Sequence, residues 1–204
     1  MKIEQAAREL SAARKIFVMT GAGVSAESGV PTFRDAQSGL WAEYDPQTLA
    51  SPEGFRDNPK LVWEWYAMRM RQLDAVEPNP GHDAIAELER RAKEFLLLTQ
   101  NVDGLHRLAG SENVWEIHGN IKRQRCTVTD QVFEPGELVI EPPFPVRTPE
   151  GHLARPDVVW FGEIIRMEAV EAVERFLEAG APDVCVVAGT SGLFPYIQQF
   201  AMIC

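Results

Sequence analysis

KIFVMTGAGVSA, residues 15–26, is the stretch that decides the fold of this chain. Its first five residues form an aliphatic run without polar alternation, which is typical of a parallel strand buried on both faces. Gly21, Gly23 and Ala26 then satisfy the G-x-G-x-x-G/A pattern of a dinucleotide-binding turn, whose glycines let the backbone approach a pyrophosphate closely. The stretch therefore predicts a strand that leads through a phosphate-binding turn into a helix.

Two further aliphatic runs end in the same way. Residues 94–98 (EFLLL) lead into TQNVDG, and residues 183–188 (DVCVVA) lead into GTSG. Because ligands of open α/β sheets bind outside the carboxyl ends of the strands, three polar strand ends predict one common crevice. We expect an α/β fold, with a Rossmann-like parallel sheet and helices on both faces, including helices at 83–93 and 167–179.

Two stretches interrupt the alternation of strands and helices. Residues 40–75 are rich in aromatic residues and are predicted to be helical from 60 to 73, while residues 122–155 are rich in proline and poor in helix signals. We expect the first to be a helical lid and the second a small irregular lobe. The remaining ranges 1–39, 76–121 and 156–204 are predicted to form the Rossmann-like domain.

The composition limits the partners of the protein. Thirty acidic against twenty basic side chains give a formal net charge of -10, which disfavours a general nucleic-acid binder. The longest apolar runs fall well short of the about 18 residues of a membrane span, and the first residues lack the apolar region of a signal peptide. We expect a cytoplasmic protein that binds neither nucleic acid nor membrane; its oligomeric state is not predicted.

The segment after the glycine-rich turn argues against hydride transfer. A dehydrogenase carries an acidic residue about 20 residues further on, at the end of a second strand, to hold the adenine ribose. This chain has instead the loop SGVPTFRD, residues 28–35, with an aromatic ring and a cation. The dinucleotide is therefore expected to be used differently.

Five motifs in this order resemble the sirtuin (Sir2) family. They are GAGVSAESGVPTFRD at 21–35, TQNVDGLH at 99–106, IHGN at 117–120, RPDVVWFGE at 155–163 and GTSG at 189–192. The resemblance implies an NAD-dependent protein deacylase that acts on acylated lysine and releases nicotinamide and O-acyl-ADP-ribose. It also implies that NAD is the cofactor and that acylated lysine peptides or proteins are the partners.

The resemblance assigns roles to individual residues. It makes His118 the general base, a role that suits an imidazole with an ordinary pKa of about 6.5, and it places Asn101 beside the nicotinamide ribose as a second catalytic residue. It implies that Val159, Trp160, Phe161 and Gly162 pair with the substrate peptide by strand addition. The cofactor would be bound by Gly21, Ala22, Gly23, Glu27, Thr32, Phe33, Arg34, Gln100, Asn101, Asp103, Gly189, Thr190 and Ser191.

Tyr66 and Arg69 bear on the acyl group. They are three residues apart on the predicted helix of 60–73 and hence on one face. The pair resembles the Tyr-x-x-Arg pair of sirtuins that prefer succinyl- and malonyl-lysine, since a guanidinium fork favours a terminal carboxylate. The alternative for the pair is a solvated arginine beside a core tyrosine. Alternatives for the protein are a deacetylase, an NAD hydrolase or ADP-ribosyl transferase, and a catalytically weak NAD-binding protein.

The chain departs from the family at two places. Most sirtuins bind zinc with two Cys-x-x-Cys pairs, whereas only Cys126 remains here and the matching positions are Thr129, Arg147 and Glu150. Because structural zinc needs four thiolate or imidazole ligands, we predict a lobe of residues 122–155 without metal. In sirtuins a further helix and strand with an adenine-binding segment follow this point, whereas twelve residues, 193–204, follow it here. We therefore expect part of the adenosine site to be incomplete in this sequence.

Overall fold

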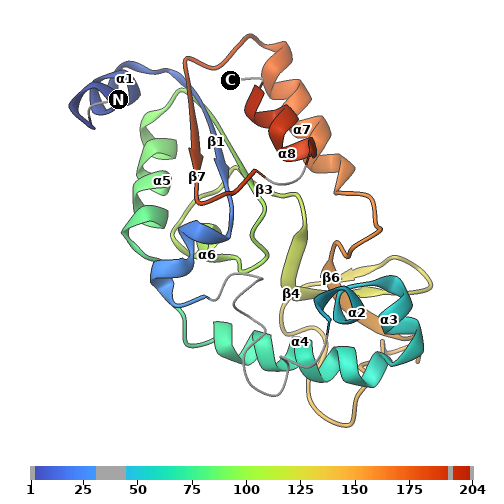
Figure 1. Ribbon diagram of the computed structural model, residues 1–204. Coiled ribbons are helices and arrows are strands. Elements are labelled where there is room, and N and C mark those ends of the chain that lie inside the picture. Colours follow the sequence, from blue (N-terminus) through green and yellow to red (C-terminus); the bar gives the residue numbers. More distant parts are fainter. Residues whose placement is uncertain (1–2, 31–44, 193–194, 203–204) are drawn as a thin grey trace.

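A four-stranded parallel sheet forms the centre of the larger lobe (Figure 1). The computed structural model describes residues 3–30, 45–192 and 195–202. Thr20 pairs with both Thr99 and Ala188, so the polar loops that follow these strands open at one edge of the sheet. The strand order is β3-β2-β1-β7, with bounds β1 Lys15–Thr20, β2 Glu94–Thr99, β3 Val114–Glu116 and β7 Val184–Ala188. The three predicted strands are confirmed, and β3 is added to them.

Alternate residues of the sheet pack against helices on opposite faces. Ile16 and Val18 of β1 pack with Ile85 of α5 (Pro80–Arg91). Phe17 and Met19 face the other way, toward α7 (Met167–Glu178) and α8 (Pro195–Met202), as Figure 1 shows. The Rossmann-like arrangement with two covered faces is therefore confirmed. Helix α1 (Ile3–Ala12) buries no side chain.

Three successive helices begin at a capping residue followed by proline. Ser51 and Asn58 accept hydrogen bonds from backbone N–H groups of α3 (Pro52–Asp57) and α4 (Pro59–Leu73), and Asn79 caps α5 in the same way. Proline suits the first helical position, where its missing N–H has no partner in any case. The helix predicted at 60–73 is therefore α4, and the one predicted at 83–93 begins earlier, at the Asn79 cap.

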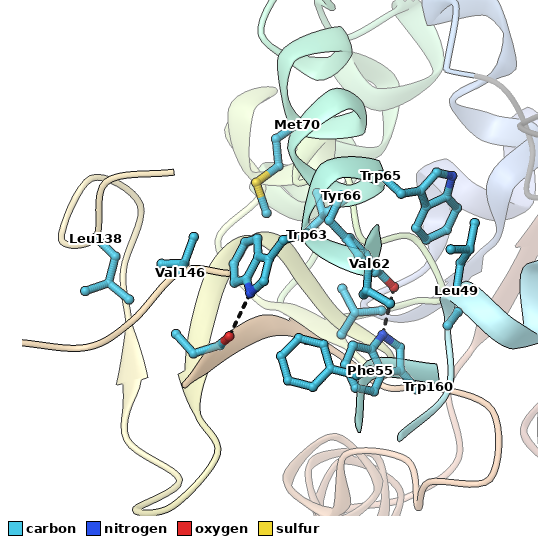
Figure 2. Packing of buried hydrophobic residues seen from close by; sticks show 14 of the residues in the cluster. Leu49, Phe55, Val62, Trp63, Trp65, Tyr66, Met70, Leu138, Val146 and Trp160 are labelled. Atoms are coloured by element: carbon cyan, nitrogen blue, oxygen red, sulfur yellow. Dashed lines mark hydrogen bonds between the residues drawn. The ribbon is translucent and has the colours of Figure 1, made fainter. Parts of the chain in front are cut away.

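The smaller lobe contains regular structure that the sequence did not predict. A three-stranded antiparallel sheet, order β5-β4-β6, is formed by β4 (Gly119–Cys126), β5 (Val132–Phe133) and β6 (Ala154–Val158). Together with α2 (Pro46–Leu49), α3 and α4 it encloses one hydrophobic core. Figure 2 shows Trp63 in that core, with its indole N–H donating to the Ala154 carbonyl at 2.8 Å. The lobe is thus a small sheet covered by helices rather than an irregular segment.

The glycine-rich turn is not followed by an α-helix. Two 3₁₀ turns, η1 (Ala22–Val24) and η2 (Ala26–Ser28), occupy that position. The prediction of a helix directly after the turn is therefore wrong. The remaining element is the short helix α6 (Leu105–Leu108) after β2. Within the ranges that the structure describes, no helix has both the length and the apolar character that crossing a bilayer requires.

Candidate active site

The loops after β1 and β7 are in direct contact at the edge where the strands end. The Gly23 N–H donates to the Gly189 carbonyl at 2.8 Å, and the Gly21 N–H donates to the Ala188 carbonyl at 3.1 Å. A Cβ on Gly23 would lie 2.8 Å from the Gly189 Cα, and a Cβ on Gly189, where φ is +65°, would lie 2.3 Å from the Val24 nitrogen. Only glycine allows this approach, which leaves the backbone of residues 22 and 23 exposed for a ligand.

Gln100 connects the end of β2 to the same place. Its side-chain amide donates to the Thr190 hydroxyl at 2.8 Å and to the Thr20 carbonyl at 3.2 Å. The loops after β1, β2 and β7 therefore meet, as the three polar strand ends predicted. Because β2 and β3 lie on one side of β1 and β7 on the other, this is the switch point where open α/β sheets bind ligands.

A buried polar cluster lies beneath the glycine-rich turn. The Ser25 hydroxyl donates to Asp103 at 2.7 Å and accepts from the Asn101 amide at 3.0 Å. His82, whose Nδ1 accepts the Asn79 N–H and thereby caps α5, places its Nε2 3.3 Å from the same hydroxyl. Burial lowers the pKa of His82, although Asp103 acts to raise it. The sequence did not single out Ser25, whose signal was its place inside the dinucleotide fingerprint.

His106 is excluded as a base by its surroundings. It is 2% exposed, its Nε2 lies 2.9 Å from the Thr20 hydroxyl, and burial together with neighbouring His82 lowers its pKa to about 3. A ring with so low a pKa stays neutral at physiological pH and is a poor proton acceptor. The imidazole that remains for proton transfer at this edge of the sheet is His118.

His118 lies between the two lobes, just before β4. Its Nδ1 is 2.9 Å from the Gln100 carbonyl, and its Nε2 is 2.6 Å from the hydroxyl of Tyr196 on α8. Burial lowers the pKa of His118, while the Gln100 carbonyl acts in the opposite direction. The ring is thus tied to the loop of Gln100 and Asn101. Tyr196 was missed, because nothing local in the sequence links it to His118.

Tyr66 and Arg69 lie on one face of α4, as their spacing predicted. Tyr66 is 1% exposed and its hydroxyl accepts a hydrogen bond from the Trp160 indole at 2.8 Å, which Figure 2 shows. The Arg69 guanidinium lies 4.7 Å from the ring centre of Trp65 and 5.8 Å from that of Tyr66. The arginine is therefore not a fully solvated helix residue. Trp160 joins this pair to the predicted peptide-binding segment.

That segment, residues 159–162, follows β6 and is held by the chain itself. Val159 donates its N–H to the His118 carbonyl at 2.8 Å, and Phe161 donates to the Ala50 carbonyl at 2.9 Å. The Trp160 N–H donates to Glu163, which also pairs with Arg155. These three N–H groups therefore have partners within the chain, and so does the Trp160 carbonyl, which accepts the Glu163 N–H at 3.0 Å.

Several predicted residues contribute less to this description. Thr32, Phe33 and Arg34 lie outside the described residues, and Glu27 and Ser191 are exposed beside the loops of Gly21 and Gly189. In the described part of the chain no three His, Cys, Asp or Glu side chains gather in a way that could hold a metal ion. At one of the four zinc positions, Arg147 donates to the Gly151 carbonyl at 2.8 Å.

Comparisons with known proteins agree on one family. The model of the Sir2 family matches residues 21–194. A protein of Deinococcus radiodurans named NAD-dependent protein deacylase is 49% identical over 201 residues, covering 95% of this chain and 79% of its own. A protein of Thermococcus kodakarensis with the same name is 50% identical over 206 residues, covering 95% and 79%. The crystal structure of a Sir2 homologue–NAD complex superposes with a TM-score of 0.87 at 41% identity, covering 100% of this chain and 78% of that one.

Proposed function

This chain belongs to the Sir2 family, and its curated relatives are named NAD-dependent protein deacylases. We propose that it removes succinyl and malonyl groups, which end in a carboxylate, from acylated lysine. The deacylase activity and the use of NAD follow from the family. The preference for an acidic acyl group rests on the surroundings of Arg69.

The residues at the edge of the sheet fit the cofactor. The exposed glycine-rich turn at Ala22 and Gly23 allows the close approach of a pyrophosphate, and the hydroxyls of Thr190 and Ser191 suit a ribose. We assign cofactor binding to these residues and to Gly21, Glu27, Thr32, Phe33, Arg34, Gln100, Asn101, Asp103 and Gly189. Bound NAD supplies the ADP-ribose that accepts the acyl group as nicotinamide leaves.

His118 supplies the proton acceptor. Because a carbonyl can only accept a hydrogen bond, the contact with Gln100 places the proton of the neutral ring on Nδ1 and leaves Nε2 as the base. Nε2 is thus suited to take a proton from a ribose hydroxyl during acyl transfer. Burial lowers the pKa of the ring and keeps it unprotonated at neutral pH.

Arg69 is the observation that carries the acyl preference. No described carboxylate forms an ion pair with it; its guanidinium contacts the aromatic rings of Trp65 and Tyr66, and the Asp103 carboxylate acts on its pKa from beyond ion-pair distance. Burial lowers its pKa, yet an arginine stays charged in proteins. A half-buried cation without a carboxylate partner is costly, and a substrate carboxylate removes that cost. Tyr66, one helical turn away, carries a hydroxyl that accepts the Trp160 indole N–H at 2.8 Å, so it fixes the ring beside Arg69.

The test is a pair of peptides that differ only in the acyl group. With succinyl-lysine, Arg69→Met should lower kcat/KM by about 10- to 100-fold, the value of one charge-assisted hydrogen bond, while acetyl-lysine turnover is kept. Arg71→Met is the matched control, because Arg71 is exposed on the same helix. Mass spectrometry identifies the acylated ADP-ribose product.

Two outcomes count against the proposal, and they differ. An unchanged ratio of succinyl to acetyl turnover in Arg69→Met refutes the acidic preference and leaves a deacetylase. Absence of nicotinamide release by the intact protein with every acyl peptide refutes the deacylase itself and favours a protein that binds NAD without this chemistry. In a working enzyme, His118→Ala should abolish release of the acylated product.

A further inference from the structure

The Tyr196 hydroxyl contacts Nε2 of His118, the nitrogen proposed to act as the base. The Tyr196 hydroxyl lies 2.6 Å from Nε2 of His118, and the two rings meet edge to face with centroids 6.0 Å apart. The Gln100 carbonyl at 2.9 Å requires the proton on Nδ1, so Nε2 of the neutral ring carries its lone pair. The tyrosine hydroxyl is then the donor, and its hydrogen bond covers the basic lone pair.

The helix that carries Tyr196 is anchored in the core. Ile197 and Phe200 of α8 are 1% and 8% exposed and pack with residues of β1, β2 and α7. These two side chains flank Tyr196 and fix where its ring can lie. The phenol is half-buried, and burial raises its pKa, so it remains a protonated donor at neutral pH. The contact with His118 is therefore part of the packed structure.

We infer that Tyr196 is a positioning residue that competes with the ribose hydroxyl of NAD for Nε2 of His118. The inference rests on the proposed role of His118 as base. One lone pair accepts one strong hydrogen bond, so the hydroxyl that orients the ring in the free enzyme must leave when the ribose hydroxyl arrives. Tyr196 thus orients the ring whose tautomer Gln100 sets, and it weakens cofactor binding by the same contact.

The competition predicts how substitutions of Tyr196 and His118 change the affinity for NAD. Tyr196→Phe keeps the ring and removes only the competing hydroxyl, so NAD should bind about three- to tenfold more tightly, the value of one neutral hydrogen bond. The gain should vanish in a His118→Ala background, because no lone pair is then left to compete for. Titration calorimetry with NAD on the four proteins of this cycle measures both effects without any turnover.

The pH profile supplies a second readout. A hydrogen bond to the neutral form of a base lowers its pKa, so removing the hydroxyl raises the pKa of His118 in the free enzyme. Burial also lowers the pKa of His118, and the hydrogen bond with the Gln100 carbonyl raises it; both remain in Tyr196→Phe. The acidic limb of kcat/KM should therefore move to higher pH in Tyr196→Phe. The acidic limb of the kcat profile should stay at the same pH, because Tyr196 is already displaced in the enzyme–substrate complex.

Each result separates the inference from its alternatives. Unchanged NAD affinity in Tyr196→Phe overturns it, as does a gain that persists without His118. A large fall in kcat also overturns it, since the hydroxyl would then relay the proton. Tighter NAD binding that depends on His118, in a protein that releases no acylated product, supports the competition while refuting the deacylase. Unchanged NAD affinity in Tyr196→Phe together with normal deacylation refutes the competition and supports the deacylase.

Discussion

The half-buried Arg69 and the half-buried arginines around Asp157 differ in their partners. The Asp157 cluster consists of Asp157 and the arginines Arg123, Arg125 and Arg166. Asp157 is 3% exposed; Arg125 donates to it at 2.8 Å, Arg166 donates to the same oxygen, and Arg123 lies 3.5 Å away. Arg69 contacts Trp65 and Tyr66 and makes no ion pair with a carboxylate in the described part of the chain.

The difference indicates what each region is for. The Asp157 cluster joins β4, β6 and the segment that enters α7, so it connects the two lobes. Arg123 also pairs with Glu116 and Arg125 with Asp130, so every arginine of the cluster has a carboxylate partner within the chain. Burial opposes ionisation of Asp157, yet Arg125 and Arg166 hold its pKa below the ordinary value. Arg69 has the same charge but no ion pair of this kind within the described chain, and the Asp103 carboxylate acts on it only from a greater distance. This difference is the basis of the proposed acyl preference.

The largest expected effect is on stability at the Asp157 cluster. Asp157→Asn leaves the guanidinium groups around an uncharged side chain, and breaking a buried ion pair from one side costs about 3 kcal/mol of unfolding free energy. Urea denaturation of both proteins at neutral pH measures the loss. The ratio of succinyl to acetyl turnover should not change. A stability equal to that of the intact protein would show that the cluster is as dispensable as a surface ion pair.

Lowering the pH should gradually remove the stabilisation that the Asp157 carboxylate contributes. Because the folded-state pKa of Asp157 is depressed, its stabilisation is fully present above the unfolded-state pKa of about 3.9. It is lost as pH falls through the lower pKa of the folded state. The difference in unfolding free energy between the intact protein and Asp157→Asn should therefore be constant near neutrality and shrink below about pH 4. A difference that is independent of pH in that range would contradict the assignment.

The same contrast explains how much could be predicted from sequence. The strands and the loops after them were predictable, because aliphatic runs ending in Gly21, Gln100 or Gly189 are local patterns. The spacing of Tyr66 and Arg69 is also local to one helix. The sequence could therefore predict the pair. Whether a carboxylate of the chain pairs with Arg69 depends on every residue near it in space, and no local pattern predicts that.

The parts that were missed depend on contacts across the chain. Ser25 meets Asp103 and His82, and Tyr196 meets His118, at separations of more than fifty residues that no local pattern encodes. The antiparallel sheet was missed because β4, with sequence GNIKRQRC, is polar and its pairing with β6 shifts register between Asn120 and Gln124. Polar strands lack the alternation from which strands are predicted.

The smallest expected effect on stability is at Arg69, and it tests the comparison most directly. Arg69→Met removes a cation–π contact of about 1 kcal/mol but also removes a half-buried charge that has no internal carboxylate. These changes oppose each other, and Met fills the space of the arginine stem, so the unfolding free energy should change by less than about 1 kcal/mol. Urea denaturation beside Asp157→Asn gives the comparison under one set of conditions. A loss as large as that of Asp157→Asn would mean that the fold itself depends on Arg69, and the proposal of an acyl carboxylate would lose its basis.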